Sequence, residues 1–476
     1  MKKYQNYEFD ISEINAAGKG LSILDGVETI IPYALPGQRV DAFVHKKKHQ
    51  HADARLKKVL QPRPDEIKPF CAHFGQPPTP QGQGCGGCSW QQISYQTQLD
   101  LKQNMLSKLL ADVVDTPVNL ILGSPIDRHY RNKVELSFGD KLYISEEDYL
   151  SLKANKTPMP TGSYLGFHVP GSFGTLVDIQ TCHLMSEALT QVYHCIREVL
   201  PRLGGEVYSP RHHTGFWRHL VLRHGLRSGQ IMVHFNTTDQ HRVNWEDMIA
   251  ALLQLKLKDA SVHSILHSIH TGDAQIVGWN TPQLLWGEPV ISESLCGLNF
   301  EISPYAFFQT NTLAAETLYQ QIVRMSHLEH APVVYDLYSG TGSIGMVLAR
   351  HGASRVYGLE EIVSAVEDAQ RNALANGLEN CQFMAGKVET LLPELLQQDK
   401  PDLIVIDPPR AGLHPKVPNM LAQIAAPQII YVSCNPAALA RDLALLQSHY
   451  TVEEIQPVDL FPQTGHLETI VRLERK

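Results

Sequence analysis

From Pro332 onward the chain alternates short apolar runs with segments of helical period, and this alternation constrains its fold more than any other feature. Apolar, strand-like runs occur at 333–337, 355–360, 403–406 and 428–432, with helical segments between them. Strands joined through helices run parallel, because a parallel crossover needs a long connection. The sequence therefore predicts an α/β fold with a Rossmann-like, doubly wound parallel sheet, followed by a last pair of strands around 455–461 and 469–473.

A chain of 476 residues is too long for one ordinary core, so further domains are expected. Short strands with turns at Asp25-Gly26 and Pro36-Gly37 predict a small, OB-like β-barrel over 1–62. A central α+β domain is predicted over 63–90 and 122–300, with an irregular Gly/Pro/Gln-rich loop at 74–84. An amphipathic helix is predicted within 90–110. Residues 91–121 are assigned, together with 301–476, to the Rossmann-like domain.

Composition narrows the class of protein. No run of 18 apolar residues and no apolar leader is present, which predicts a cytoplasmic protein without a membrane partner. The net charge of −8 argues mildly against nucleic-acid binding, but residues 1–60 hold ten Lys/Arg against seven Asp/Glu, a local balance of +3. The basic run at 45–51 predicts either a grip on phosphates or a solvated face.

A glycine-rich turn after the predicted strand at 333–337 indicates a nucleotide cofactor. Gly340-Thr341-Gly342-Ser343-Ile344-Gly345 matches the dinucleotide pattern, and Glu360 lies where an acid would hold ribose hydroxyls. NAD and S-adenosylmethionine sites both use such turns, and so does any tight strand-to-helix connection. Asp407-Pro408-Pro409-Arg410 has no evident use in a dehydrogenase, although it would also serve as a proline-stiffened loop.

A cysteine and a glutamate complete the chemistry. Cys434 follows the apolar run at 428–432, and Glu468 lies downstream in Gly465-His466-Leu467-Glu468. Carbon 5 of uracil becomes nucleophilic when a thiolate adds to carbon 6, and a base must later remove the carbon-5 proton. On its own, Cys434 would be interpreted as a buried core thiol and Glu468 as a surface charge. Their occurrence together with Asp407 and the glycine turn favours methyl transfer.

These motifs together resemble the RNA 5-methyluridine methyltransferase family, in particular its iron–sulfur members that act on 23S ribosomal RNA. The resemblance implies that Cys434 is the nucleophile and Glu468 the proton-removing base. It also implies a TRAM-type barrel, a ribosomal RNA partner, a monomer, and S-adenosylmethionine contacts at Gln309, Tyr338, Ser343, Glu360 and Asp407. The matching segments are 307–311, 336–342, 407–410, 433–436 and 466–469. Lys387 stands where some relatives have a short polar residue, so no role is assigned to it.

Three cysteines form a cluster: Cys71, Cys85 and Cys88. A pair separated by two residues suits both zinc and iron–sulfur groups, and spacing alone leaves both open. The resemblance implies a [4Fe-4S] cluster with Cys182 as the fourth ligand, with zinc as the alternative. The other cysteines, Cys195, Cys296 and Cys381, are expected in the core.

Charged and aromatic segments at 128–133 and 216–219 suit single-stranded RNA or a salt-bridged surface. Tyr305, Phe307 and Phe308 suit either base stacking or the core. The alternatives to methylation of ribosomal RNA are the same reaction on transfer RNA and an inert iron–sulfur RNA-binding protein. An NAD-linked oxidoreductase would leave Cys434 and the Asp-Pro-Pro-Arg segment unexplained.

Overall fold

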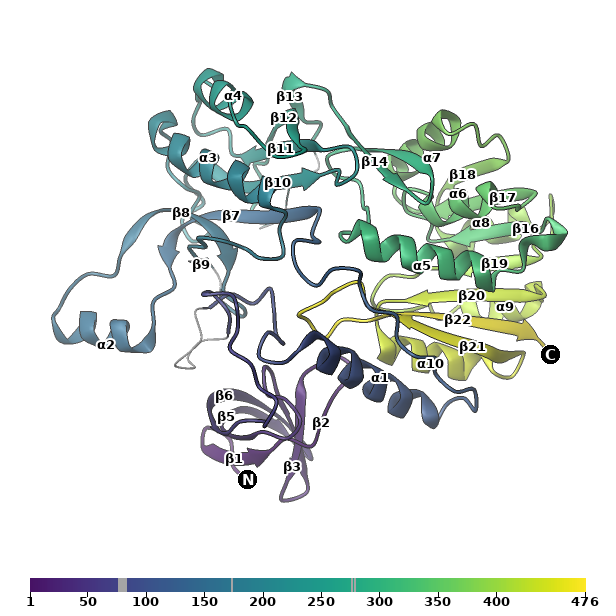
Figure 1. Cartoon of the computed structure of the whole chain (residues 1–476), viewed down its shortest axis with the longest axis horizontal. Coiled ribbons are helices and arrows are strands. Elements are labelled where there is room, and N and C mark those ends of the chain that lie inside the picture. The colour runs from purple at the N-terminus through teal and green to yellow at the C-terminus, as the bar shows by residue number, and fades with distance from the viewer. Residues whose placement is uncertain (76–83, 173, 275–276, 278–279) are drawn as a thin grey trace.

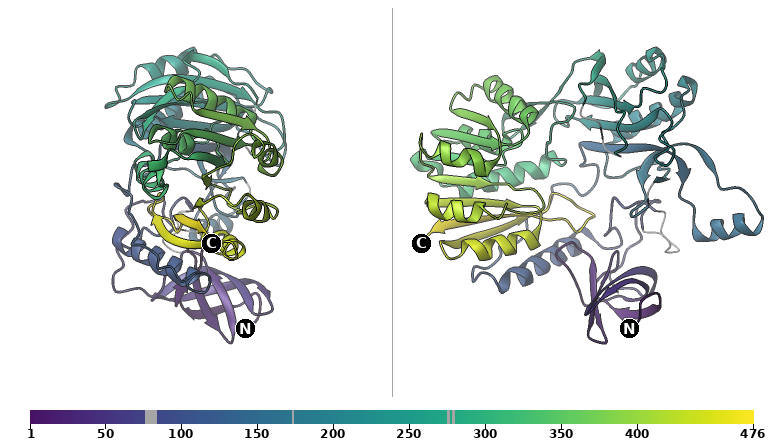
Figure 2. Two further views of the ribbon diagram at one scale, coloured as in Figure 1. Left: turned by 90° about the vertical axis from the view of Figure 1, so that its right-hand side faces the viewer. Right: turned by 180° about the vertical axis from the view of Figure 1, so that it is seen from behind.

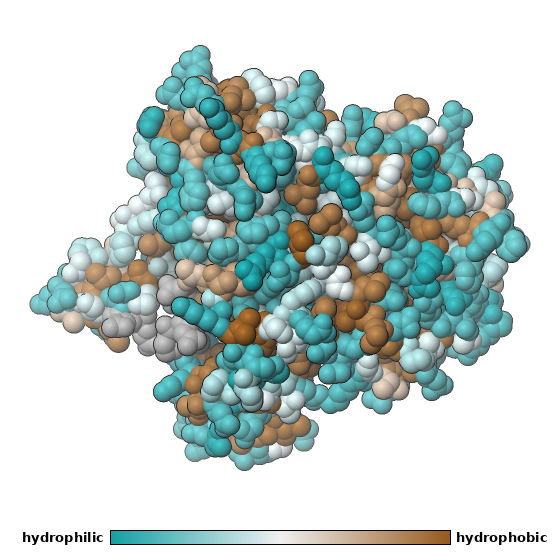
Figure 3. Space-filling model, viewed as in Figure 1, coloured by the Kyte–Doolittle hydropathy of each residue, from teal (hydrophilic) through white to brown (hydrophobic). Residues whose placement is uncertain are grey.

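The computed structural model describes residues 1–75, 84–172, 174–274, 277 and 280–476, so most of the predicted loop at 74–84 lies outside the described residues. Within that part of the chain the strands form three large sheets and one two-stranded hairpin (Figure 1). No helix in the described ranges is long and apolar enough to cross a membrane. On the face shown in Figure 3, hydrophilic residues cover most of the surface and apolar residues lie in scattered groups.

The C-terminal sheet has the strand order β18-β17-β16-β19-β20-β22-β21. Its first five strands are parallel, which confirms the predicted Rossmann-like α/β fold. The last two strands are longer than predicted, and β22 runs antiparallel to both β20 and β21. A loop rather than a helix joins β21 to β22, so the chain turns back on itself. The strands are β16 (Val333–Leu337), β17 (Arg355–Glu360), β18 (Cys381–Ala385), β19 (Leu403–Ile406), β20 (Gln428–Ser433), β21 (Tyr450–Val458) and β22 (Glu468–Arg475).

Helices cover both faces of this sheet, as a parallel sheet requires. Alternate residues of β20 show it: Ile430 and Val432 join one buried cluster, whereas Ile429 and Tyr431 join the other. The first cluster contains α5 (Thr312–Met325), α6 (Ser343–Arg350) and α7 (Val363–Ala375). The second contains α1 (Tyr95–Ala111), α8 (Val388–Leu395), α9 (Val417–Ile424) and α10 (Pro436–Leu446).

Helix α1 starts five residues later than the predicted segment because Ser94 caps it, accepting a hydrogen bond from the Thr97 backbone N–H. Its apolar face, which includes Met105 and Leu106, belongs to the core of the C-terminal sheet. It contacts α10 on that side and β2 of the N-terminal sheet on the other (Figures 1 and 2). Helix α1 therefore joins two parts of the molecule that lie far apart in the sequence.

The N-terminal sheet has six strands in the order β1-β5-β6-β4-β3-β2. The predicted turn at Asp25-Gly26 is present, with positive φ at both residues, between β3 and β4. This finding agrees with a separate N-terminal β module, while the predicted boundary at 62 stays a prediction. The strands are β1 (Asn6–Asp10), β2 (Glu13–Ile14), β3 (Gly20–Leu24), β4 (Val27–Ile31), β5 (Arg39–Lys48) and β6 (His51–Gln61).

The central sheet has seven strands in the order β13-β12-β11-β10-β7-β8-β9. Helices α3 (Glu187–Leu203) and α4 (Glu246–Leu253) pack on it, and α2 (Glu146–Ala154) lies on an arm between β7 and β8 (Figure 1). The hairpin of β14 (Ile291–Leu295) and β15 (Leu298–Ile302) leads to the C-terminal sheet. The central strands are β7 (Lys133–Leu142), β8 (Thr161–His168), β9 (Thr175–Val177), β10 (Trp217–His224), β11 (Gln230–Thr237), β12 (Ser261–Ile269) and β13 (Gln283–Gly287).

Candidate active site

A cavity of about 1020 Å³ opens at the carboxyl ends of the parallel strands of the C-terminal sheet. Parallel strands end at one edge of a sheet, so motifs far apart in the sequence meet there. All seven residues predicted as catalytic or cofactor-binding line this cavity: Gln309, Tyr338, Ser343, Glu360, Asp407, Cys434 and Glu468. Their spatial convergence is what the sequence motifs and the family resemblance led us to expect, while the role of each residue stays a prediction.

The glycine turn after β16 forms a cradle open to the cavity. Gly340 has φ +55°, and no atom lies within 4 Å of the position that a Cβ would take. Its backbone N–H donates to Glu360 Oε2 at 3.0 Å, and the Ile362 N–H donates to Oε1 at 2.9 Å. Two backbone donors therefore orient the Glu360 carboxylate beside the turn, where it suits the hydroxyl groups of a ribose.

Gly342 is the tightest position of this turn, and we expect Gly342→Ala to destabilise the protein. Its φ is +72°, and a Cβ would lie 2.4 Å from the ring of the buried Phe383. Left-handed backbone and overpacking together should lower the free energy of unfolding by about 2–5 kcal/mol. Gly377→Ala is the matched control, because Gly377 also has positive φ (+67°) but no atom near its Cβ position. Urea denaturation of both variants checks this; equal losses would contradict a steric effect at Gly342.

Two acids, the buried Asp336 and the half-buried Asp407, make the cavity favourable for a positive charge. Asp336 Oδ2 accepts a hydrogen bond from the Gly345 N–H at 3.0 Å, whereas Oδ1 is buried with no partner among the described residues. Burial first, then the charges of Asp407 and Glu360, raise the pKa of Asp336 to about 7. Burial raises the pKa of Asp407 to about 7 as well. A cationic ligand would offset the cost of ionising both groups.

Cys434 directly follows β20, and Glu468 begins β22, the strand that pairs with β20. Burial, then the charges of Glu468 and Asp407, raise the pKa of the Cys434 thiol to about 11, while Arg410 lowers it. Burial and the charge of Asp407 raise the pKa of Glu468 well above its ordinary value. The two groups are thus electrostatic neighbours in the cavity, and the free protein holds Cys434 as the neutral thiol at neutral pH.

We expect the alkylation rate of Cys434 to keep rising between pH 9 and about pH 11. Only the thiolate reacts, and the raised pKa of Cys434 moves its formation to higher pH than for an ordinary thiol. Glu468→Gln should lower this midpoint, because it removes a negative charge that opposes the thiolate. Iodoacetamide labelling followed by mass spectrometry measures the rate; Glu474→Gln, in the same strand, is the control. A midpoint at or below pH 9 in the unaltered protein would contradict the assignment.

The cavity also contains Arg131, Arg410 and His466, polar residues to which the sequence assigned no individual role in catalysis or cofactor binding. Arg410 Nη2 donates to His466 Nδ1 at 3.2 Å. Burial, then the charges of Arg410, Lys102 and Arg131, lower the pKa of His466 to about 4, so its imidazole is neutral. Arg410 and His466 lie inside motifs already singled out, and Arg131 lies in a basic segment, but only the fold brings all three to one cavity.

The three aromatic residues predicted to stack on a base or to lie in the core, Tyr305, Phe307 and Phe308, have different surroundings. Phe307 lines the cavity with 64% of its surface exposed, which leaves it free to stack on a base. Phe308 is buried against Phe300, with ring centroids 5.7 Å apart, and is a core residue. Tyr305 lines the cavity, and its hydroxyl lies 2.8 Å from that of Ser268. Lys387 also lines the cavity and pairs with Glu361 at 3.7 Å.

The interpretation of 216–219 as an RNA-binding or salt-bridged surface is wrong. Trp217 and Arg218 are almost fully buried at the start of β10. Arg218 donates to the backbone oxygens of His270 and Ala274, so its charge stabilises a local loop. In 128–133, Arg128 stacks on Phe70 at 4.1 Å and Tyr130 is buried, which leaves Arg131 as the residue facing the cavity.

Three of the four cysteines predicted as ligands, Cys71, Cys85 and Cys88, have pKa values that respond to the other thiols of the set. Burial, and then charges that include the Cys182 thiolate, raise the pKa of Cys71, Cys85 and Cys88, that of Cys85 to about 11. Nevertheless, no group of three or more His, Cys, Asp or Glu side chains in the described ranges is arranged to hold a metal ion. The donor set has the chemistry of a thiolate-bound group, while the arrangement seen here is not that of a ligand sphere.

Comparisons with known proteins agree with this geometry. A family model described as tRNA (uracil-5-)-methyltransferase matches residues 295–476. An uncharacterized RNA methyltransferase of Chlorobaculum tepidum is 36% identical over 451 residues, which cover 92% of this chain and 90% of the relative. One of Clostridium tetani is 35% identical over 480 residues, covering 100% and 99%.

Among solved structures, that of the tRNA (uracil-54, C5)-methyltransferase of Pyrococcus abyssi, in complex with S-adenosyl-L-homocysteine, is similar to this chain. The TM-score is 0.72 and the identity 24%, with 98% of this chain and 100% of that chain covered. At this identity the likeness establishes the fold alone.

Proposed function

Because this chain belongs to the RNA 5-methyluridine methyltransferase family, we propose that it methylates carbon 5 of a uridine in 23S ribosomal RNA through a covalent cysteine–uracil adduct. The observation that carries the proposal is the cavity in which Cys434, Glu468 and the glycine turn meet. S-adenosylmethionine supplies the electrophilic methyl group when it is bound. Its positive charge suits the acids Asp336 and Asp407, and its ribose suits Glu360.

The first step belongs to Cys434. Its sulfur forms a bond to carbon 6 of the uracil, and the electron pair of the 5,6 double bond moves toward carbon 5 and the oxygen at carbon 4. This step needs the thiolate, and a positive charge in the cavity lowers the pKa of Cys434 because it offsets Glu468 and Asp407. The target base must leave its stack to reach this half-buried sulfur, and the exposed Phe307 can support it or a neighbouring base.

The last step belongs to Glu468. Once carbon 5 carries the methyl group, Glu468 takes the carbon-5 proton and the 5,6 double bond re-forms. The bond between sulfur and carbon 6 then breaks, and the sulfur leaves with its electron pair. Glu468 is buried and has a raised pKa, which makes it a strong enough base for this task when ionised.

The natural test is methylation of separated ribosomal and transfer RNA from a strain lacking this protein. Purified protein and S-adenosylmethionine should introduce 5-methyluridine into 23S RNA, as mapped by mass spectrometry. Methylation of transfer RNA alone would establish the second candidate, which the description of the matching family model favours. If neither RNA is methylated, the remaining candidate is an inert iron–sulfur RNA-binding protein.

The proposed function also involves the N-terminal β module, with its basic run at 45–51, and the cysteine cluster. Lys46, on the β5–β6 hairpin, is 71% exposed in its side chain and free to reach phosphates beyond its contact with Asp53. We propose that Cys71, Cys85, Cys88 and Cys182 hold a [4Fe-4S] cluster, supported by the effect of the Cys182 charge on the pKa of the other three thiols. Anaerobic purification should then yield about four irons per chain; stoichiometric zinc would establish the alternative.

A further inference from the structure

The loop of residues 459–467 joins β21 to β22 and ends at the proposed base, Glu468. It also carries His466 into the cavity. This loop has little regular structure of its own, so its course depends on the side chains that hold it. Those side chains come from α1 and from other segments outside the sheet that bears Cys434, among them Tyr130 and Asn311, which donate to the backbone oxygens of Pro462 and Leu460.

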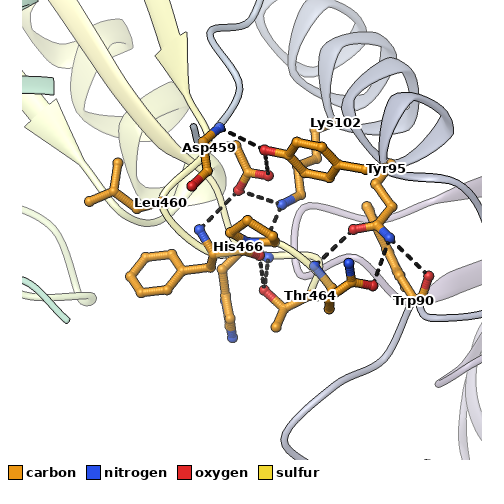
Figure 4. Close-up of polar contacts among 12 residues, drawn as sticks. Trp90, Tyr95, Lys102, Asp459, Leu460, Thr464 and His466 are labelled. Carbon is orange, nitrogen blue, oxygen red and sulfur yellow. Dashed lines mark hydrogen bonds and ion pairs between the residues drawn. The ribbon is translucent and has the colours of Figure 1, made fainter. Parts of the chain in front are cut away.

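The centre of these contacts is a buried ion pair (Figure 4). Lys102 Nζ, on α1, lies 2.8 Å from Asp459 Oδ1, and neither side chain has any exposed surface. Lys102 also donates to the Phe461 backbone oxygen at 3.3 Å, and the Phe461 N–H donates to Asp459 Oδ1 at 2.9 Å. The Tyr95 hydroxyl donates to Asp459 Oδ2 at 3.0 Å. The pair therefore fixes the backbone at the start of the loop.

Further contacts hold the rest of the loop. Gln98, one turn before Lys102 on α1, exchanges two hydrogen bonds with Gln463: its Oε1 accepts from the backbone N–H at 2.8 Å, and its Nε2 donates to Oε1 at 3.0 Å. Gly465 packs so closely on Gly18 that a Cβ on it would lie 2.5 Å from the Gly18 Cα. Contacts from α1 and from the N-terminal module thus meet on the loop that leads to the base.

A fully buried ion pair is a costly way to stabilise a fold, since apolar residues of similar volume often stabilise as well or better. Its advantage is that it fixes the relative orientation of the segments it joins, because charged hydrogen bonds allow few geometries. The loop's charges also act at the cavity: after burial and Arg410, Lys102 lowers the pKa of His466 while Asp459 raises it. The feature that distinguishes this ion pair is its position at the start of the loop that leads to Glu468, rather than the stability that it adds to the fold.

We propose that Lys102 and Asp459 are positioning residues for the step in which Glu468 removes the carbon-5 proton. The inference rests on the proposed function and deepens it. The ion pair holds the 459–467 loop, and the loop sets where β22 begins and where His466 and Glu468 face the bound base. Cys434 directly follows β20, which is also held by β19 on the side away from β22 and the loop. Damage to the pair should therefore affect proton removal more than addition of the thiol.

An RNA substrate containing 5-fluorouridine separates the two steps, because its carbon 5 carries no proton for the base to remove. The covalent adduct then persists, and its rate of formation reports thiol addition and methyl transfer alone. For Lys102→Met we expect adduct formation within about threefold of the unaltered protein. Turnover on ordinary RNA should fall about 100-fold, the effect of a misplacement near 1 Å. On ordinary RNA the adduct should also accumulate on denaturing gels.

Tyr95→Phe keeps the ion pair and removes one hydrogen bond to Asp459, so it serves if Lys102→Met does not fold; a smaller loss in the same step is expected. Lys108→Met is the matched control, since Lys108 lies on the same helix and pairs with Glu13 at the surface. Equal loss of adduct formation and turnover, or no loss of either, would overturn the inference. If the unaltered protein itself forms no adduct, the proposed function fails first, and the two failures are distinguishable.

Discussion

Cys434→Ala should abolish methylation while binding of S-adenosylmethionine is kept. The sulfur is the only atom of this side chain that can form the bond to carbon 6, so turnover is expected to fall on the order of 10⁴-fold or more. The cofactor is proposed to contact the glycine turn and Glu360, which the substitution leaves in place. Turnover is measured with radiolabelled methyl groups, and cofactor affinity by titration calorimetry.

Cys195→Ala provides the control for this variant. Cys195 is a half-buried thiol in α3 on the central sheet, and it does not line the cavity. The control should methylate at the rate of the unaltered protein. Retained methylation in Cys434→Ala would rule out the covalent mechanism, and loss of cofactor binding would show that the variant disturbs more than the nucleophile.

Glu468→Gln should trap the RNA on the protein. Glutamine has similar size and keeps a hydrogen-bonding group, but it cannot accept the carbon-5 proton. Loss of a general base slows its step by about 10²–10⁴-fold, so the methylated adduct should accumulate. A denaturing gel with labelled RNA shows it as a slowly migrating band that also carries the methyl label.

Glu474→Gln, at the far end of the same strand, should form no lasting adduct. In the double variant Cys434→Ala/Glu468→Gln the band should disappear, because the sulfur that anchors the RNA is gone. A band that survives in the double variant would place the covalent bond on another residue. Normal turnover of Glu468→Gln would show that another group removes the proton.

Much of the fold and the composition of the site could be predicted from local pattern. Buried parallel strands such as 403–406 and 428–432 are continuous apolar runs, and the helices between them have a clear period. Residues directly after such strands share one edge of the sheet, so Asp407 and Cys434 were expected together. The antiparallel course of β22 was missed, because nothing in an apolar run encodes the direction of its neighbour.

Long-range contacts could not be predicted. Lys102 and Asp459 are 357 residues apart, and in the sequence each is an ordinary surface charge. Residues 216–219 resemble an exposed basic and aromatic segment, yet the central sheet buries Arg218 and pairs it with backbone oxygens. Burial and partners depend on which elements pack together, and these depend on the whole chain.

The chemistry that the chain carries follows from its amino-acid order: a thiol, a carboxylate and a glycine turn, each at a strand end, whose local conformations follow from a few neighbouring residues. How those groups are held and charged depends on the packing of the whole fold. The pKa of Cys434 depends on burial and on the charge of Glu468, and the pKa of Glu468 depends on burial and on the charge of Asp407. The loop before Glu468 depends on a helix from the other end of the chain. Such effects act through space, over a few ångströms that separate residues hundreds of positions apart.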